Sequence, residues 1–279
     1  MTHPEHPVLN EGPTLRDGVQ MPWLGLGVYK SKEGEEVIHA VKSAIAAGYR
    51  SIDTAAIYGN EEGVGQAIRE CGVPREELFI TTKVWNDDQG YEATLQACET
   101  SLKKLGLDYV DLYLIHWPGK DKYKETWKAL IYLQEQGLVR SIGVSNFQIH
   151  HLRDIIEDSG VVPTVNQVEL HPLNSQKELL QYCQEQGIVL EAWSPLMQGR
   201  LDHPVITELA AKYSKTPAQI ILRWDLQHGI IVIPKSVKEH RIRENGDIFD
   251  FELSAEDLAQ LDSLNENKRF GPNPDEFLF

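Results

Sequence analysis

Four residues whose side chains can share a proton stand along the first half of the chain: Asp53, Tyr58, Lys83 and His116. A tyrosine phenol is a weak acid with a reference pKa of about 10, and a nearby ammonium group favours its ionised form. We therefore expect Lys83 to lower the pKa of Tyr58, Asp53 to hold Lys83, and His116 to donate a hydrogen bond to a substrate carbonyl. Such a set makes a proton donor and an oxyanion site. It has no obvious nucleophile and no metal-ligand geometry, so no metal is expected.

These candidates stand at or near the ends of short apolar runs typical of β-strands. Eight runs are expected, at Trp23–Gly27, Arg50–Asp53, Leu78–Lys83, Val110–His116, Val139–Ser145, Thr164–Glu169, Val189–Trp193 and Ile230–Ile233. Helical patterns occupy Glu35–Ala47, Glu61–Cys71, Tyr91–Leu105, Tyr123–Gln136, Phe147–Asp158, Lys177–Gln186, Pro217–His228 and Ser254–Leu264. Several end at a glycine such as Gly48 or Gly106, which takes a positive φ without a Cβ clash.

Strands that alternate with helices predict parallel pairing through right-handed crossovers. The expected fold is a single (β/α)8 TIM barrel, with a doubly wound open sheet as the alternative. Turn residues around Asn10–Gly12 and Asp17–Gly18 favour an N-terminal β-hairpin, and extra helices are expected near the C-terminus. The tail Lys268–Phe279 is expected to be irregular. No linker divides the chain, so residues 1–279 are expected to form one domain.

The carboxyl ends of barrel strands carry the active site in proteins of this architecture. Taken singly, Asp53 could cap a segment, Lys83 could lie at the surface and His116 could be structural. Their gathering at consecutive strand ends favours a catalytic site. Outside this set, Asp111 is expected to be a paired structural carboxylate and His150-His151 to lie on the surface. Glu169 and His171 fit either an acid–base or a structural role.

The composition limits the partners. The chain has 279 residues, with 27 Lys+Arg against 42 Asp+Glu and a net charge of −15. Nucleic acids and anionic membranes need cationic surface, so neither is expected as a partner. The three scattered cysteines suit a reduced, cytoplasmic protein. No apolar run approaches the roughly 20 residues of a membrane span, and Met1–Asn10 lacks the apolar region of a signal peptide.

One basic cluster stands out in this acidic chain. The segment from 235 to 243 carries four cations, Lys235, Lys238, Arg241 and Arg243, against one acid, Glu239. A solvated helix face would also explain it. An anion site beside the loop after the eighth strand is favoured, because arginine binds phosphate through two hydrogen bonds. The expected anion is a phosphate group, which the family resemblance described next implies to be the 2′-phosphate of NADPH. Neither Gly25-Leu26-Gly27 nor Gly63-Val64-Gly65 makes a dinucleotide-binding glycine fingerprint.

Several motifs in order resemble the aldo-keto reductase superfamily. They are GYRSIDTA at 48–55 with Tyr58, DLYLIHWP at 111–118, GVSNF at 143–147 and IPKSV at 233–237. The likeness runs from Leu24 to Asn267 and is closest to bacterial glyoxal/methylglyoxal and 2,5-diketo-D-gluconate reductases. It implies a (β/α)8 barrel that reduces small aldehydes and dicarbonyls with NADPH, and a role in detoxification. Tyr58 would be the general acid, Lys83 its tuner, Asp53 the partner of Lys83 and His116 the carbonyl-orienting group.

The resemblance also assigns a cofactor site by position. Ser145, Asn146 and Gln167 would hold the nicotinamide carboxamide, and Trp193 would stack on the ring where many relatives have tyrosine. The pyrophosphate side would meet Ser194, Leu196 and Gly199. The adenosine end would be held by Lys235, Ser236, Val237, Arg241, Glu244 and Asn245.

The substrate pocket is expected to be shallow and open. Only about nine residues separate His116 from the helix near Glu125, and the tail is short. Trp85, Trp117 and Tyr29 would form its apolar wall, and a monomer is expected.

Two other functions stay open here. One is an NADPH-binding regulatory barrel that senses redox state, and the other is a metal-dependent hydrolase, which would need more clustered histidines.

Overall fold

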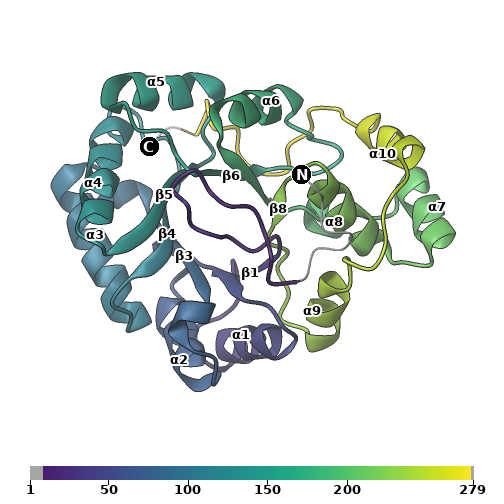
Figure 1. Ribbon diagram of the computed structural model, residues 1–279, viewed down its shortest axis with the longest axis horizontal. Helices are drawn as coiled ribbons and strands as arrows, with labels where there is room; N and C mark the ends of the chain where they lie inside the picture. The colour runs from purple at the N-terminus through teal and green to yellow at the C-terminus, as the bar shows by residue number, and fades with distance from the viewer. Residues whose placement is uncertain (1–8, 278–279) are drawn as a thin grey trace.

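The computed structural model describes residues 9–277, in which eight parallel strands form a barrel surrounded by helices (Figure 1). The strands are β1 (Gly25–Gly27), β2 (Ser51–Asp53), β3 (Phe79–Val84), β4 (Val110–Ile115), β5 (Val139–Ser145), β6 (Val165–Glu169), β7 (Val189–Trp193) and β8 (Ile231–Val232). They pair in chain order from β1 to β8. Two parallel bridges, Leu24 with Val232 and Gly27 with Lys235, close the ring between β8 and β1. The predicted barrel is confirmed, and the open-sheet alternative is wrong.

The helices cover the outside of the barrel. They are α1 (Glu35–Ala46), α2 (Glu61–Glu70), α3 (Tyr91–Leu105), α4 (Tyr123–Glu135), α5 (Ile149–Ser159), α6 (Lys177–Gln186), α7 (Pro204–Tyr213), α8 (Pro217–Gln227), α9 (Glu239–Gly246) and α10 (Ala255–Asp262). Two of them, α7 and α9, were not among the expected helices. Pro204 reads as a helix breaker, yet it opens α7 at a position where proline is tolerated. Helix α9 contains a single large apolar residue, buried Ile242, so it has no apolar periodicity that would predict a helix.

Alternating side chains divide the core into two layers. In β4, Leu112 and Leu114 face the barrel interior, whereas Tyr113 and Ile115 pack in the large cluster shared with the helices. This alternation follows from the period of two in a strand.

Asp111 is fully buried and accepts hydrogen bonds from Arg75 at 2.7 Å and Arg140 at 3.0 Å. The prediction that Asp111 is a paired structural carboxylate is confirmed.

The N-terminal hairpin closes the barrel end opposite the candidate catalytic residues. Thr14 and Gln20 form an antiparallel bridge, and the turn lies between them. The side chains of Leu15 and Met21 are buried against Phe79 and Ile231, the first residues of β3 and β8. The segment crosses the middle of the barrel in Figure 1. The expected hairpin is therefore confirmed, whereas most of Met1–Asn10 lies outside the described residues.

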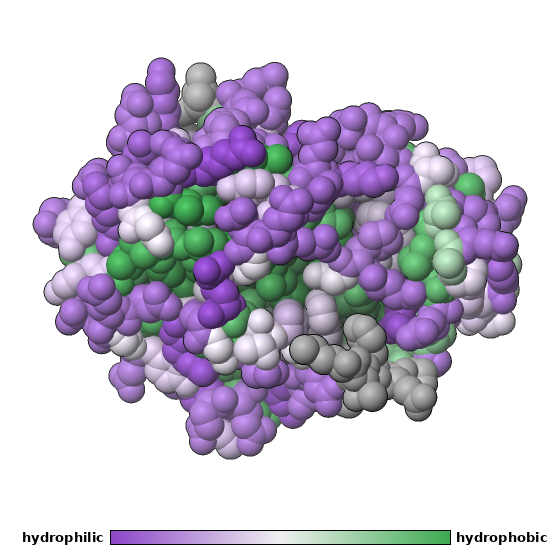
Figure 2. All heavy atoms as spheres, turned by 45° about the horizontal axis from the view of Figure 1, so that its top comes forward, coloured by the Kyte–Doolittle hydropathy of each residue, from purple (hydrophilic) through white to green (hydrophobic). Residues whose placement is uncertain are grey.

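The molecular surface is mainly polar on the face shown in Figure 2, where hydrophobic atoms gather in recesses between hydrophilic ridges. Among residues 9–277, no helix combines the length and the apolar character that a membrane crossing requires.

Candidate active site

A buried ion pair lies at the carboxyl ends of β2 and β3. Lys83 Nζ is 2.6 Å from Asp53 Oδ1 and donates to the carbonyl oxygen of Thr54 at 2.8 Å. The side chains of Lys83 and Asp53 are 0% and 2% exposed. Burial by itself would lower the pKa of Lys83, but the charge and hydrogen bond of Asp53 together with the charges of Tyr58 and Glu191 outweigh burial and leave that pKa raised. Lys83 is therefore a fixed cation, which is the arrangement that the sequence predicts.

Tyr58 meets this cation from a short 3-10 helix, Ala56–Tyr58, in the loop after β2. Its hydroxyl lies 3.4 Å from Lys83 Nζ. The expected fall in the Tyr58 pKa is wrong: burial of the phenol raises the pKa to about 12, although Lys83 opposes the rise. The cause is that a low-dielectric site disfavours the phenolate. Tyr58 consequently keeps its proton throughout the neutral range and can donate it.

His116 completes the group directly after β4. Its ring centroid lies 5.8 Å from that of Tyr58 and 5.2 Å from that of Trp85. Burial, with a contribution from Lys83, holds the pKa of His116 well below its usual value, so the imidazole is neutral. Its Nδ1 is buried and has no hydrogen-bond partner among the described residues. The four predicted catalytic residues are thus together at one end of the barrel.

Aromatic side chains border this group. Tyr29 is 56% exposed, and its ring lies 5.1 Å from that of Tyr58. Trp85 packs edge-on against His116. Trp117 is buried instead, and its ring centroid lies 4.5 Å from that of Phe277 in the C-terminal tail. The tail therefore contributes an aromatic wall that the sequence did not predict.

The C-terminal tail is irregular, as predicted, over its described part, and it crosses the strand ends. The carboxylate of Glu169, at the end of β6, accepts the backbone N–H groups of Phe270 at 2.6 Å and Gly271 at 3.0 Å. It also lies 3.0 Å from Nε2 of His171. Glu169 and His171 therefore have the structural role. A Cβ added to Gly271 would overlap the Trp193 ring, so only glycine lets the tail lie against that ring.

A second contact holds the tail to α5. His150 Nε2 lies 2.7 Å from Asp275 Oδ1, and His151 Nε2 lies 3.8 Å from the same atom. The surface prediction holds for His150 but is wrong for His151, which is 8% exposed. The three residues have the donor types of a metal site. However, His151 Nδ1 accepts the N–H of Gln148, which leaves the proton of the neutral ring on Nε2, the atom facing Asp275.

The residues expected to hold the nicotinamide lie together at the ends of β5, β6 and β7. Ser145 Oγ donates to the carbonyl oxygen of Gln167 at 2.7 Å. Asn146, in the left-handed region with φ 63°, donates to the carbonyl oxygen of His116 at 3.0 Å. Trp193 Nε1 donates to Asn146 Oδ1 at 2.8 Å. The nicotinamide candidates and the catalytic group therefore share one hydrogen-bonded network.

Two loops carry the other cofactor candidates. Ser194, Leu196 and Gly199 lie in the tight turn after β7, where Ser194 and Gly199 have positive φ. The loop after β8 and helix α9 contain Lys235, Ser236, Val237, Arg241, Glu244 and Asn245. Arg243 is paired with Glu239 at 2.9 Å. Among the described residues Arg241 has no such partner, which leaves its guanidinium free to meet an anion.

The family of this chain follows from its similarity to known proteins. The model of the Aldo/keto reductase family matches residues 23–266. This chain belongs to the aldo/keto reductase family. It is 65% identical over 266 residues to glyoxal reductase of Bacillus subtilis, covering 95% of this chain and 96% of that protein. It is 54% identical over 268 residues to methylglyoxal reductase DkgA of Escherichia coli, covering 94% and 96%. A Gox0644 variant in complex with NADPH has 46% identity and a TM-score of 0.92, covering 96% and 98%.

One buried carboxyl of this aldo/keto reductase escaped prediction. Glu191 in β7 is 0% exposed and accepts a hydrogen bond from Gln167 Nε2 at 2.8 Å. The signal was present, because an acid inside the apolar run Val189–Trp193 is as unusual as Asp111 inside its strand.

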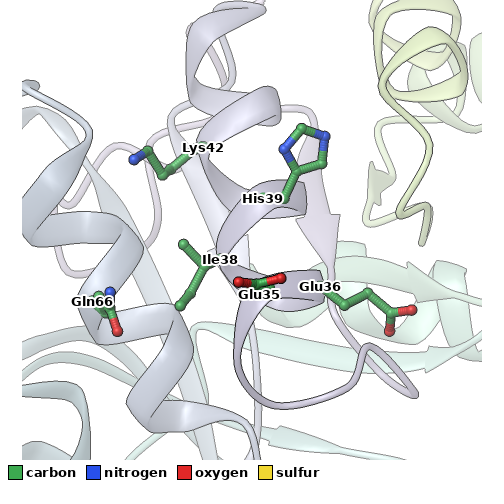
Figure 3. A pocket seen from close by; sticks show the side chains of 6 residues that line it. All are labelled: Glu35, Glu36, Ile38, His39, Lys42 and Gln66. Carbon is green, nitrogen blue, oxygen red and sulfur yellow. The ribbon is translucent and has the colours of Figure 1, made fainter.

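A surface hollow also lies over α1 and α2, away from the strand ends (Figure 3). Its lining side chains are Glu35, Glu36, Ile38, His39, Lys42 and Gln66. Lys42 is paired with Glu70 at 3.1 Å, and His39 lies 3.4 Å from Ser43. Lys42 reaches from α1 to Glu70 of α2, whereas His39 contacts Ser43 of its own helix. These polar groups do not converge on a common point, so the hollow is not part of the catalytic group.

Proposed function

We propose that this aldo/keto reductase uses NADPH to reduce small aldehydes and dicarbonyls, such as methylglyoxal, to alcohols. The contact of Lys83 with both Asp53 and Tyr58, beside neutral His116, carries the proposal. The relatives named for glyoxal and methylglyoxal reduction support the substrate class. The Gox0644 variant in complex with NADPH supports the cofactor.

The residues present fit NADPH. Trp193 offers a flat ring, and Ser145, Asn146 and Gln167 offer polar groups beside it. Arg241 stands without an ion pair among the described residues and can hold a 2′-phosphate. The pyrophosphate would lie along the turn with Ser194, Leu196 and Gly199. When bound, NADPH supplies a hydride to the carbonyl carbon.

The chain's own residues supply the proton that the carbonyl oxygen receives. Neutral His116 donates a hydrogen bond that orients the carbonyl oxygen, and Tyr58 transfers its phenolic proton to that oxygen. Lys83 stabilises the negative charge that develops on Tyr58, and Asp53 keeps Lys83 within reach. The product is the alcohol, in which the carbonyl oxygen carries the proton from Tyr58.

The pocket favours small substrates. Tyr29, Trp85 and Trp117 would border the substrate, and Phe277 adds to the wall at Trp117. With few groups to contact the distant part of a large molecule, selection would depend on carbonyl reactivity more than on shape.

Neither the regulatory barrel nor the metal-dependent hydrolase, the two alternative functions, is supported. The relatives reported above are named as reductases, and none of these names describes a regulatory subunit. The hydrolase would need several metal ligands at the strand ends. Within residues 9–277, the cluster with suitable donors is His150, His151 and Asp275, which lies on α5 and the tail.

Finer parts of the proposal concern the whole protein. We propose that residues 1–279 form one domain, that the chain acts as a monomer in the cytoplasm without a nucleic-acid partner, and that it serves detoxification of reactive dicarbonyls. The net charge of −15 supports the absence of a nucleic-acid partner, and the scattered cysteines support a cytoplasmic location.

A substrate panel tests the proposal. Purified protein would be given NADPH with methylglyoxal, glyoxal, an aromatic aldehyde and a steroid ketone, and NADPH oxidation would be followed. We expect the highest kcat/KM for the small dicarbonyls. Absence of turnover with every carbonyl, or a steroid ketone that exceeds all small aldehydes, would contradict it.

A further inference from the structure

Glu191 and Gln167 are neighbours inside the barrel. They are directly paired in register between β7 and β6. Both are buried, at 0% and 2% exposed. Gln167 reaches across the barrel to Asp53 of β2, so its side chain lies between the catalytic ion pair and Glu191.

Gln167 gives both of its amide hydrogens to carboxyl groups. Its Nε2 lies 2.7 Å from Asp53 Oδ2 and 2.8 Å from Glu191 Oε2. Because both neighbours offer acceptor oxygens, the nitrogen end of the amide must face them. The amide oxygen then remains as an acceptor for another group.

Among the described residues, the side chain of Glu191 has no hydrogen-bond partner other than Gln167. Its second oxygen, Oε1, is buried and has no hydrogen-bond partner among the described residues. The groups around it are Gln167 of β6, Asp53 of β2, Lys83 of β3 and apolar Ile231, its register partner in β8. Burial and then Asp53 raise the pKa of Glu191 to about 8, so the carboxyl is mainly neutral at pH 7. A neutral carboxyl still accepts a hydrogen bond through its carbonyl oxygen.

We propose that Glu191 is a positioning residue for the cofactor: together with Asp53 it fixes the Gln167 amide so that its oxygen accepts a hydrogen bond from the nicotinamide carboxamide. The idea rests on the proposed use of NADPH. Asp53 is engaged with Lys83, so Glu191 supplies the acceptor that holds the second amide hydrogen. Loss of that acceptor lets the amide rotate and present its nitrogen to the cofactor instead.

The test compares NADPH dissociation constants, measured by fluorescence without substrate. Glu191→Met, which has no carboxyl acceptor, should weaken NADPH binding about 5-fold, on the scale of one hydrogen bond. Glu191→Gln keeps an acceptor oxygen and should stay within about twofold of wild type. Asp225→Asn alters another fully buried carboxyl, in α8, and serves as the control that should leave binding unchanged.

A double-mutant cycle with Gln167→Ala separates positioning from general packing. In the Gln167→Ala background, Glu191→Met should have no further effect on NADPH binding. An undiminished effect there, or equal losses in Glu191→Met and Glu191→Gln, would overturn the inference. If Glu191→Met does not fold, Glu191→Asp withdraws the carboxyl from Gln167 and should show the same loss.

The result also distinguishes this inference from the proposed function. If the wild-type protein does not bind NADPH, the proposed function itself fails. If Gln167→Ala weakens NADPH binding while Glu191→Met and Glu191→Asp do not, only the role of Glu191 fails. A second readout is the face of the nicotinamide ring from which hydride is transferred, measured with NADPH that carries deuterium on one face. A rotated amide should make this transfer less selective for one face in Glu191→Met than in the wild-type protein.

Discussion

At the residue scale, Lys83 connects the candidate catalytic residues, because its ammonium contacts Asp53, the Thr54 carbonyl oxygen and the Tyr58 hydroxyl. A buried lysine without a carboxylate partner would tend to lose its proton. Here Asp53 keeps the cation in place, and Tyr58 remains a phenol whose raised pKa ensures that it carries the proton to be donated.

Arg241 should distinguish the two nicotinamide cofactors. Replacing it by alanine should weaken NADPH binding about 10- to 100-fold, the range for a charge-assisted contact, and should leave NADH nearly unchanged. Dissociation constants for both cofactors provide the measurement. Arg243→Ala is the matched control, because Arg243 is already paired with Glu239. Equal losses for both cofactors would remove the 2′-phosphate role of Arg241.

Sequence reasoning predicted which residues gather at the candidate active site but not their environments. The ion pair of Asp53 with Lys83 could be foreseen because both residues end neighbouring strands. The direction of the Tyr58 pKa could not, since it depends on how far burial outweighs Lys83, and burial of a loop residue is not visible in the spacing. The contact of Glu191 with Gln167 depends on the register between β6 and β7.

At the element scale, the tail joins distant parts of the barrel mouth. Its backbone N–H groups donate hydrogen bonds to Glu169 at the end of β6. The tail then passes Trp193 and reaches α5 and Trp117. Sequence patterns located all eight strands because each is a short apolar run. They missed the path of the tail because its contacts join residues about a hundred positions apart and follow no local periodicity.

Gly271 is the point where the tail meets Trp193. Gly271→Ala would place a methyl group against the indole, and overpacking of this kind typically costs about 1–3 kcal/mol. We expect weaker NADPH binding, by about 3- to 10-fold, because Trp193 must move or the tail must lift. Titration of NADPH by fluorescence checks this. The exposed neighbour Pro272→Ala should behave as wild type. Wild-type affinity in Gly271→Ala would show that the tail does not set the position of Trp193.

At the scale of the whole molecule, the buried carboxyl of Glu191 links stability to pH. Its pKa in the folded protein is about 8, above the ordinary value of 4.5. Between these values the folded state holds one more proton than the unfolded state, so the free energy of unfolding falls as pH rises. This contribution is fully present below about pH 4.5 and is lost as pH passes about 8.

Urea unfolding at pH 5, 7 and 9 measures this linkage. Relative to Glu191→Gln, which cannot ionise, the wild-type protein should lose up to about 1.4 kcal/mol of unfolding free energy per pH unit within that window. Comparison with the variant removes the pH dependence of other groups. Parallel curves for the two proteins would contradict a raised pKa at Glu191.

The turnover of Tyr58→Phe with methylglyoxal tests most directly whether Tyr58 donates the proton. This variant removes the hydroxyl that lies 3.4 Å from Lys83 Nζ and keeps the aromatic ring. We expect a loss of at least about 10²-fold in kcat/KM, the usual range for removal of a general acid, with the NADPH dissociation constant unchanged within about twofold. Near-normal turnover of Tyr58→Phe would contradict the assignment of Tyr58 as the proton donor.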